Sequence, residues 1–391
     1  MKEDIMENDI VLQPEYVEKF HCDGSRCNSK CCGNWLITID TEAYKKYQHV
    51  KNPAIRKKIL SALEPNPAKS GFLIKLRDNG VCPMVCDDSL CYIQRNLGED
   101  ALSMTCKCYP RMVMRIGAYQ FRTLNMSCPL AAEQALFSDS AMNIQQFTAN
   151  DDTPAWHLTA LRAENKPIPD GDDLLAVHII MSGLAILQNT AYTMEKRLVL
   201  LGLFIDKLEN EVHGIEAVSE LVTYYNSEQF QQEISSLWDN WQYSSGEHKK
   251  IMEKILNVLD KEDIFDLAES LLCVNENYEE VYAERHEGIE RDMAGIWERY
   301  WQQEWLHHVF PCAIEGSFVH NYFTFLLAYE VAKLYIYGVY KPHENNNILE
   351  MFRFFSKAFD HSGSFAATLV KEAADFEAEP LKFMQVLLRV K

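Results

Sequence analysis

The segment Phe20-His21-Cys22-Asp23-Gly24-Ser25-Arg26-Cys27-Asn28-Ser29-Lys30-Cys31-Cys32-Gly33-Asn34-Trp35 opens a cysteine-rich stretch that ends at Cys128. This stretch contains ten of the twelve cysteines of the 391-residue chain, and the 263 residues after it contain only Cys273 and Cys312. The ten are Cys22, Cys27, Cys31, Cys32, Cys82, Cys86, Cys91, Cys106, Cys108 and Cys128. Such an uneven distribution indicates that these cysteines have a local role in the front part of the chain.

Disulfides, burial in a core and metal binding are three explanations for these cysteines. Disulfides need an oxidising compartment, and the first residues contain neither the basic nor the apolar region of a secretion signal. Burial as a small apolar side chain explains the two isolated cysteines of the later chain. It does not explain adjacent Cys31 and Cys32 with Cys27 one helical turn upstream, because thiolates this close repel one another unless a cation holds them. The pattern therefore favours a metal site.

The spacing of the cysteines narrows the choice of metal without fixing it. Structural zinc sites usually use pairs of cysteines separated by two residues, and the chain contains no such pair. A sulfur-rich site with more thiols than one tetrahedral ion requires suits an iron–sulfur cluster at least as well as zinc. A single cluster uses only some of these thiolates, and the spacing does not show which ones.

Several segments together resemble the FliB family of flagellin lysine-N-methylases. Besides residues 20–35, the resemblance rests on Gly80-Val81-Cys82-Pro83, Leu90-Cys91-Tyr92-Ile93-Gln94, Leu102-Ser103-Met104-Thr105-Cys106, Tyr109-Pro110-Arg111 and Leu124-Asn125-Met126-Ser127-Cys128-Pro129. The order of the segments, the double cysteine and the Cys-Pro endings all agree. The front half is also similar to cysteine-rich zinc- or iron-chelating proteins of the YkgJ type. Residues 301–311 and the apolar segment 322–340 resemble the C-terminal half of the methylase family, which extends the likeness over most of the chain.

This resemblance implies a bacterial enzyme that transfers a methyl group from S-adenosylmethionine to the ε-amino group of lysines in flagellin. It also implies a [4Fe-4S] cluster. The cysteines that match the family pattern, and are therefore implied to bind the metal, are Cys22, Cys27, Cys31, Cys32, Cys82, Cys91, Cys106 and Cys128. Cys86 and Cys108 lie outside that pattern and are the first candidates for cysteines that do not bind the cluster. The resemblance assigns no residue to catalysis or to binding of S-adenosylmethionine.

The sequence lacks the usual glycine-rich loop for a nucleotide-like cofactor. None of its sixteen glycines lies two residues from another, so the G-x-G of a Rossmann-type loop is missing. The methyl donor is therefore expected at another surface, beside the cluster. Two alternative functions stay open. One is a non-catalytic iron–sulfur or zinc module that acts as a chelator or redox sensor, and the other is a zinc-stabilised protein that binds flagellar partners.

Charge is divided unevenly along the chain. The net charge is −19, but residues 1–130 carry 18 Lys and Arg against 15 Asp and Glu, and the remaining residues carry 20 against 42. Nucleic-acid binding requires a basic face, which this pattern does not predict. The acidic part is explained by a solvated helical surface, or by attraction of lysine-bearing proteins. With no spanning segment or secretion signal, we expect a cytoplasmic protein without membrane insertion. The oligomeric state is not predicted.

The hydrophobic pattern predicts a mostly helical α+β protein. A cysteine-rich module with a few short strands around a metal cluster, residues 1–130, precedes a larger all-helical domain, residues 131–391, with a linker-like break at 164–172. Strands are predicted over 35–40, 72–76 and 119–124. Helices are predicted over 41–63 with a break at Asn52-Pro53, 91–97, 129–137, 174–187, 197–208 and 322–340. Residues 1–21 are predicted to be a polar lead-in with a short amphipathic piece at 16–20.

Overall fold

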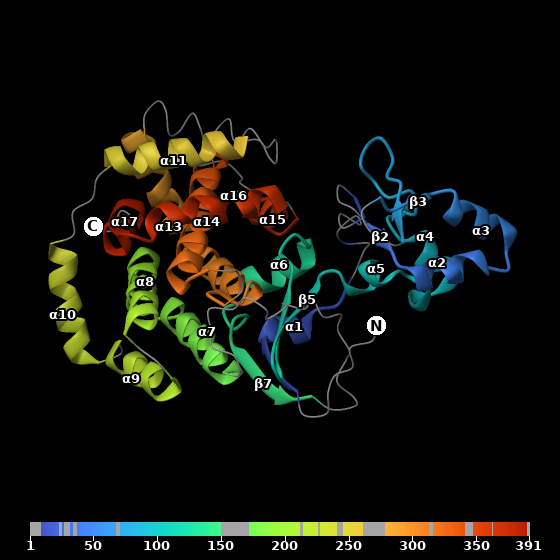
Figure 1. Cartoon of the computed structure of the whole chain (residues 1–391). Coiled ribbons are helices and arrows are strands. Elements are labelled where there is room, and N and C mark those ends of the chain that lie inside the picture. Colours follow the sequence, from blue (N-terminus) through green and yellow to red (C-terminus); the bar gives the residue numbers. More distant parts are fainter. Residues whose placement is uncertain are drawn as a thin grey trace.

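Helices make up most of the protein, and short strands form two small sheets (Figure 1). The computed structural model describes residues 9–22, 26, 32–33, 37–67, 71–149, 172–211, 214–225, 227–240, 245–260, 278–312, 316–340, 347–361 and 363–388. In Figure 1 a small lobe lies to one side of a larger helical body. The predicted fold class, mostly helical with strands in the front part, is confirmed.

The small lobe is built from short elements whose ends are fixed by local capping. Its sheet has the order β2 (Thr38–Ile39), β4 (Phe72–Ile74), β3 (Leu63–Pro65). Its helices are α2 (Thr41–Gln48), α3 (Pro53–Leu60), α4 (Tyr92–Leu97), the short 3-10 helix η1 (Glu99–Ala101) and α5 (Met104–Cys108). Asp40 caps α2 by accepting a hydrogen bond from the Ala43 amide, and Asn52 caps α3. The predicted helix break at Asn52 is therefore confirmed. Gly98 ends α4 with φ of 83°, a value that favours glycine.

A four-stranded sheet joins the front of the chain to the helical body. Its order is β5 (Arg111–Ile116), β6 (Tyr119–Leu124), β1 (Ile10–Pro14), β7 (Ile144–Thr148), and β1 runs parallel to β6 and antiparallel to β7. The helices α1 (Glu15–Lys19) and α6 (Pro129–Leu136) follow β1 and β6. The predicted strand 119–124 and helix at 129–137 are confirmed. The prediction of a polar lead-in is wrong for residues 10–14, because pairing with β6 and β7 makes this short apolar segment an interior strand.

The helical body is organised around one fully buried helix. Its helices are α7 (Asp173–Leu187), α8 (Met194–Asn210), α9 (Ile215–Tyr225), α10 (Glu228–Asp239), α11 (Ser245–Asp260), α13 (Tyr278–His307), α14 (Phe318–Val339), α15 (Ile348–His361), α16 (Gly363–Ala373) and α17 (Pro380–Leu388), with the short 3-10 helix η3 (Ala374–Phe376) before α17. Residues 318–337 of α14 are buried, and helices of the body pack against it on several sides. An all-round apolar helix is typical of such a central position.

The described residues form two hydrophobic cores. One core lies inside the small lobe and contains residues between Ile37 and Ile93. The other, much larger, takes in α1, β5, β6 and α6 together with the helices of the body. Residues from the first 130 therefore contribute to both cores. The domain boundary at residue 130 stays a prediction, and residues 164–171 of the predicted linker lie outside the described part of the chain.

Charged side chains inside the body are paired with one another. Lys333 of α14 is 4% exposed, and its Nζ lies 3.1 Å from Glu195 Oε1 and 3.6 Å from Glu330 Oε1. Glu330 is also 3.2 Å from Nε2 of the buried His248. Burial opposes a charge on Glu195, but the neighbouring Lys333 ammonium holds the pKa of that carboxyl below its usual range. Lys333 thus compensates two buried carboxyl groups.

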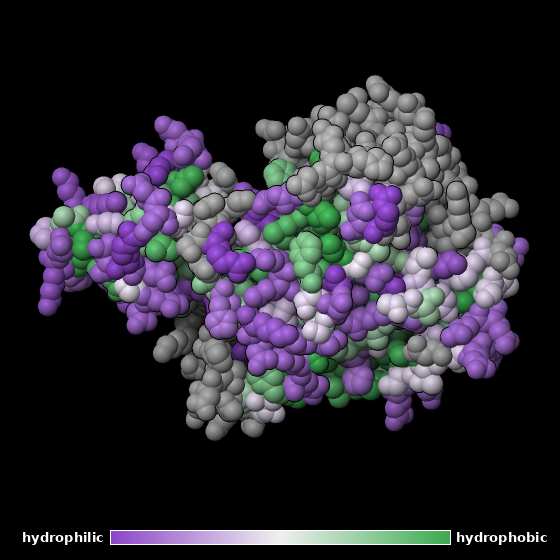
Figure 2. Space-filling model, turned by 180° about the vertical axis from the view of Figure 1, so that it is seen from behind, coloured by the Kyte–Doolittle hydropathy of each residue, from purple (hydrophilic) through white to green (hydrophobic). Residues whose placement is uncertain are grey.

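The face of the protein seen in Figure 2 is largely hydrophilic where its residues are described. Figure 2, which shows the molecule from behind, has mostly hydrophilic side chains on both the narrow lobe and the larger body, with small hydrophobic groups between them. Among the described residues, no helix combines the length and apolarity needed to cross a membrane. The buried helix α14 is accordingly a core element of the body.

We expect Lys333→Met to destabilise the protein by about 3–5 kcal/mol, because removal of one partner leaves buried charge uncompensated. Lys207→Met is the matched control: Lys207 pairs with Glu211 on the surface, where the pair is worth about 0–1 kcal/mol. Denaturant unfolding of both variants measures the difference. Equal losses in the two variants would contradict this account of the buried charges.

Candidate functional site

A cavity in the front part of the chain collects the predicted metal-binding cysteines. The cavity has a volume of about 640 Å³, within the usual range of cofactor sites. The cysteines that line it are Cys22, Cys32, Cys82, Cys91, Cys106 and Cys128. They come from loops and helix ends that are separated by up to a hundred residues of sequence, and the fold brings them to one place.

Local backbone structure explains how several of these cysteines reach the cavity. The Cys82 amide donates a 2.7 Å hydrogen bond to the Cys32 carbonyl oxygen, which fixes the two loops side by side. Cys91 and Cys128 are the N-cap residues of α4 and α6. Cys106 lies in the first turn of α5, where its amide donates to Ser103 Oγ. Helix N-termini favour anionic ligands, and a sulfur in such a position is suited to binding a cation as thiolate.

The other front-part cysteines divide into two groups. Cys27 and Cys31, both predicted metal ligands, lie outside the described residues. Cys86 and Cys108 are described, but they are not among the described residues that line the cavity. These are the two cysteines that do not match the family pattern, so the cavity and the pattern select the same described cysteines.

The remaining lining is apolar with several basic groups. Basic side chains come from Arg95, Lys107 and Arg111, and the Arg111 guanidinium lies 5.4 Å from the centre of the Phe20 ring. Arg95 is paired with Asp88 at the surface. Such cations offset the negative charge that several thiolates bring to one site.

The described sulfur atoms are not gathered as tightly as the ligands of one zinc ion. A Zn–S distance of about 2.3 Å places the four sulfurs of a zinc site about 3.8 Å apart. Among the described residues, no three cysteine sulfurs lie within 4.8 Å of one another. The six described thiols and the volume of the cavity leave room for a multi-iron cluster, which uses four thiolates.

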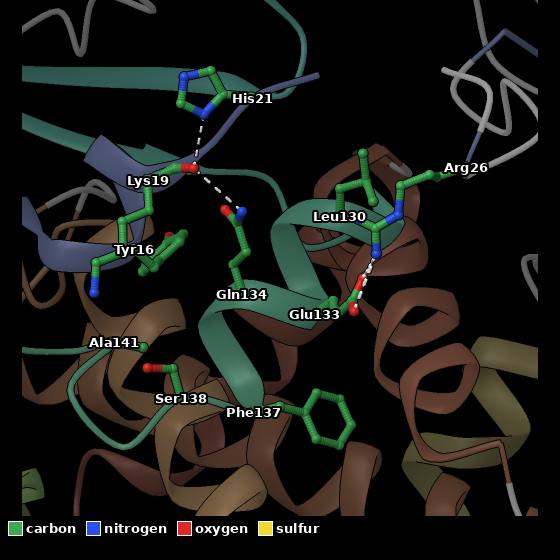
Figure 3. A pocket seen from close by; sticks show the side chains of 10 residues that line it. All are labelled: Tyr16, Lys19, His21, Arg26, Leu130, Glu133, Gln134, Phe137, Ser138 and Ala141. Carbon is green, nitrogen blue, oxygen red and sulfur yellow. Dashed lines mark hydrogen bonds and ion pairs between the residues drawn. The ribbon is translucent and has the colours of Figure 1, made fainter. Parts of the chain in front are cut away.

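A smaller pocket lies next to the cysteine-lined cavity and shares His21 and Leu130 with it (Figure 3). The pocket has a volume of about 360 Å³ and lies between α1 and α6. On its wall the Arg26 guanidinium donates a 3.1 Å hydrogen bond to Glu133 Oε2. Phe137, at the end of α6, is 52% exposed beside it. This pocket therefore offers an apolar and a charged surface close to the cavity.

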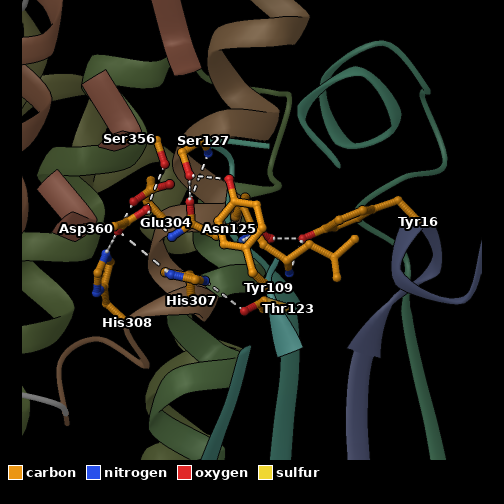
Figure 4. Close-up of polar contacts among 12 residues, drawn as sticks. Tyr16, Tyr109, Thr123, Asn125, Ser127, Glu304, His307, His308, Ser356 and Asp360 are labelled. Carbon is orange, nitrogen blue, oxygen red and sulfur yellow. Dashed lines mark hydrogen bonds and ion pairs between the residues drawn. The ribbon is translucent and has the colours of Figure 1, made fainter. Parts of the chain in front are cut away.

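The turn between β6 and α6 ties the cavity to the helical body. Arg353 of α15 donates from Nε and Nη2 to the Ser127 carbonyl oxygen at 3.0 and 2.9 Å. Asn125 Nδ2 donates to Asp360 Oδ2 at 2.8 Å, and Ser127 Oγ lies 2.8 Å from Tyr109 Oη (Figure 4). Cys128, the next residue, is thereby positioned by contacts with α15.

A buried group of histidine and carboxylate side chains lies at the far end of this turn (Figure 4). His308 Nε2 is 3.1 Å from Asp360 Oδ1 and 3.4 Å from Glu304 Oε2, and His307 Nε2 is 3.8 Å from Asp360 Oδ1. Burial and the charge of Asp360 raise the pKa of Glu304 to about 7. Burial opposes protonation of His308, but both carboxylates outweigh it and raise its pKa to about 9. Glu304-x-x-His307 is a motif that the sequence shows, but no sequence pattern connects it with Asp360, which lies more than fifty residues further along the chain.

Fold and site together define a class: this is a mostly helical protein with a cavity lined by cysteines. The family model described as the FliB lysine N-methylase C-terminal domain matches residues 183–387, about half of the chain. The chain therefore belongs to the FliB family, as its sequence motifs predicted. The resemblance of the front half to YkgJ-type proteins stays a prediction.

Curated relatives share part of the chain. It is 33% identical over 146 residues to a lysine-N-methylase of Salmonella choleraesuis (strain SC-B67), and 32% identical over 146 residues to a lysine-N-methylase of Salmonella typhimurium (strain LT2). Each alignment covers 37% of this chain and 36% of the relative, so the chain spans about a third of their length. The flagellar biosynthetic protein FliU of Salmonella muenchen is 33% identical over 140 residues, which cover 35% of this chain and 83% of the relative. No solved structure matches the chain.

We expect Arg353→Met to loosen the turn that precedes Cys128. The substitution leaves the buried Ser127 carbonyl without its two donors and costs about 1–3 kcal/mol of stability. Cys128, which is 6% exposed, should then be alkylated faster in metal-free protein, whereas the exposed Cys106 should not change. Mass spectrometry of the alkylated peptides measures both rates. Arg291→Met, at a surface ion pair, is the control, and the prediction fails if the two variants label Cys128 equally fast.

Proposed function

We propose that this protein transfers a methyl group from S-adenosylmethionine to the ε-amino group of lysines in flagellin. The proposal includes a [4Fe-4S] cluster held by cysteines of the front part of the chain. Family membership supports lysine methylation. The name of the Salmonella muenchen relative, a flagellar biosynthetic protein, supports a substrate in the flagellar system. The observation that carries the proposal is the convergence of six pattern-matching cysteines on one cavity.

Four cysteines would hold the cluster, drawn from the six described cysteines that line the cavity and from Cys27 and Cys31, which the resemblance implies. A sulfur-rich donor set suits an iron–sulfur cluster and not a hard cation. When bound, the cluster supplies Lewis-acidic iron that can engage the amino and carboxylate groups of the methyl donor. The basic side chains of the lining, Lys107 and Arg111, favour an anionic cluster and the donor carboxylate.

The reaction requires a neutral lysine amine in line with the donor's methyl–sulfur bond. The amine lone pair forms the new N–C bond, the methyl–sulfur bond breaks, and its electron pair returns to the sulfur. A proton then leaves the methylated ammonium for solvent or a nearby acceptor. Because an ordinary lysine has a pKa of about 10.4, an apolar site that disfavours the charged amine increases the reactive fraction. The largely apolar lining of the cysteine cavity meets this requirement.

We further propose that the substrate lysine reaches the cavity across the smaller pocket of Figure 3. The two spaces meet at His21 and Leu130, so a side chain in one borders the other. Phe137 offers an apolar surface to the aliphatic part of a lysine, and Glu133 offers a carboxylate to its ammonium group.

The decisive experiment uses the full chain purified without oxygen. Iron, sulfide and zinc are measured in the same sample, and flagellin is then incubated with the protein and S-adenosylmethionine carrying a labelled methyl group. Iron and sulfide in about equal amounts with labelled lysines would support the enzyme. Iron without labelling would favour the non-catalytic module, and colourless protein with zinc would favour the zinc-stabilised binding protein.

We expect Cys82→Ser to lower the iron content strongly and to abolish methyl transfer, because Cys82 lines the cavity and is 6% exposed. Cys108→Ser should keep both iron and activity, since Cys108 is not among the described lining residues. Iron analysis and labelling of flagellin are run on both variants. Equal iron content in the two variants would argue against the cavity as the cluster site.

We expect Phe137→Ser to raise the KM for flagellin roughly tenfold, which corresponds to about 1.4 kcal/mol of lost contact, with little change in kcat. Phe147→Ser is the matched control, because Phe147 is an exposed phenylalanine of β7 outside the pocket lining. Steady-state methylation of flagellin gives both parameters. A raised KM in the Phe147→Ser control, or an unchanged KM in Phe137→Ser, would remove this path from the proposal.

A further inference from the structure

The histidine and carboxylate group at the end of the Asn125–Ser127 turn has the composition of a metal site. It contains Glu304, His307 and His308 at the end of α13 and Asp360 of α15. Glu304, His307 and Asp360 are at most 5% exposed, and His308 is 25% exposed. The ligand atoms of His307, His308 and Asp360 lie within 4.8 Å of one another. The group is part of the helical body and is separate from the cysteine cavity.

Three buried atoms of this group have no hydrogen-bond partner outside it among the described residues. Glu304 Oε2, His308 Nε2 and Asp360 Oδ1 face one another as ion pairs, and none of them makes a further hydrogen bond to a described residue. Buried polar atoms are nearly always satisfied, and those that are not often mark the place of an ion or water. Here His308 Nε2 lies 3.1 Å from Asp360 Oδ1 and 3.4 Å from Glu304 Oε2.

These separations match those of ligands around one small ion. Metal–ligand distances of about 2.0–2.2 Å for imidazole nitrogen and carboxylate oxygen place tetrahedral ligands about 3.3–3.6 Å apart. Asp360 Oδ1 lies 3.1 Å from His308 Nε2 and 3.8 Å from His307 Nε2, which is close to these values, and the ligand atoms of all three residues lie within 4.8 Å of one another. Glu304 Oε2 lies beside this trio, 3.4 Å from His308 Nε2.

The second atoms of the same side chains are held by neighbouring polar groups. Asp360 Oδ2 accepts hydrogen bonds from Asn125 Nδ2 at 2.8 Å and from Ser356 Oγ at 2.7 Å, which leaves Oδ1 directed to the group. His307 Nδ1 lies 2.8 Å from Thr123 Oγ1, which leaves Nε2 as the ligand atom. Such outer contacts orient the ligands of metal sites in proteins.

We propose that His307, His308 and Asp360 bind one divalent transition-metal ion, of which zinc is the representative, with Glu304 beside them. Two imidazoles with one carboxylate suit zinc or iron, and not a soft monovalent ion. The two positive charges of the ion would compensate the Asp360 and Glu304 carboxylates inside the protein. The site would join α13 and α15 through the ion and fix the side chain that holds Asn125.

The test counts zinc in the full chain and identifies its ligands. Protein is dialysed against a weak chelator, given excess zinc, separated by gel filtration and analysed for zinc and iron together. We expect the wild type to retain about one zinc more than His307→Asn or His308→Asn, with iron unchanged. We also expect Thr123→Val to bind this zinc about 10–100-fold more weakly, because it frees His307. His320→Asn, which removes a histidine paired with Glu377 elsewhere in the body, is the control that should keep the zinc.

Zinc-edge X-ray absorption on the wild type gives a result that does not depend on the variants. Nitrogen and oxygen ligands at about 2.0–2.2 Å for the additional zinc would support the site, and sulfur at about 2.3 Å would assign that zinc to the cysteines. Circular dichroism checks that each variant folds. If no variant folds, the X-ray absorption of the wild type decides whether the site binds zinc. Equal zinc in the wild type and in a folded His308→Asn variant, or a sulfur-only shell, would overturn the proposal.

Discussion

The contact between α15 and the turn after β6 determines how the two parts of this protein fit together. Two donors of one guanidinium, Arg353, bind the same Ser127 carbonyl oxygen, and Asp360 accepts from Asn125. A carbonyl buried at the end of a strand needs such donors, because water does not reach it. Because an unpaired buried carbonyl would lower the stability of the fold, these donors hold the turn in place. Cys128 follows directly, so the position of one wall of the cysteine cavity depends on a helix more than 200 residues further along the chain.

Much of the local structure could be predicted from sequence because its signals are local. Asn52 before Pro53 stops one helix and caps the next, and Gly98 takes a backbone conformation that favours glycine. The strand 10–14 could not be predicted in this way. Its apolar run is short, and its stability comes from β6 and β7, whose residues lie more than a hundred positions away. Propensity gives no information about such a pairing, which is a property of the whole fold.

The same division between local and distant signals applies to the site. The density of cysteines, and the motifs around them, were visible in the sequence and named the described cysteines that line the cavity. Which neighbours complete the cavity was not visible, because Tyr47 and Ile74 belong to elements whose approach depends on the core of the small lobe. His307 and His308 were visible as a pair. Their meeting with Asp360 depends on the packing of α13 against the rest of the body, for which one sequence has no pattern.

The cysteine cavity and the buried histidine group are linked by hydrogen bonds that transmit changes of position. From Tyr109 the hydrogen bonds run through Ser127 Oγ to Asn125 Oδ1, and from Asn125 Nδ2 to Asp360 Oδ2. An amide accepts at its oxygen and donates at its nitrogen, so it orients both neighbours. It does not pass a proton from one to the other without losing its resonance-stabilised form. The chain of contacts therefore transmits position and not protons: a change that moves Asp360 moves Asn125 and the turn before Cys128.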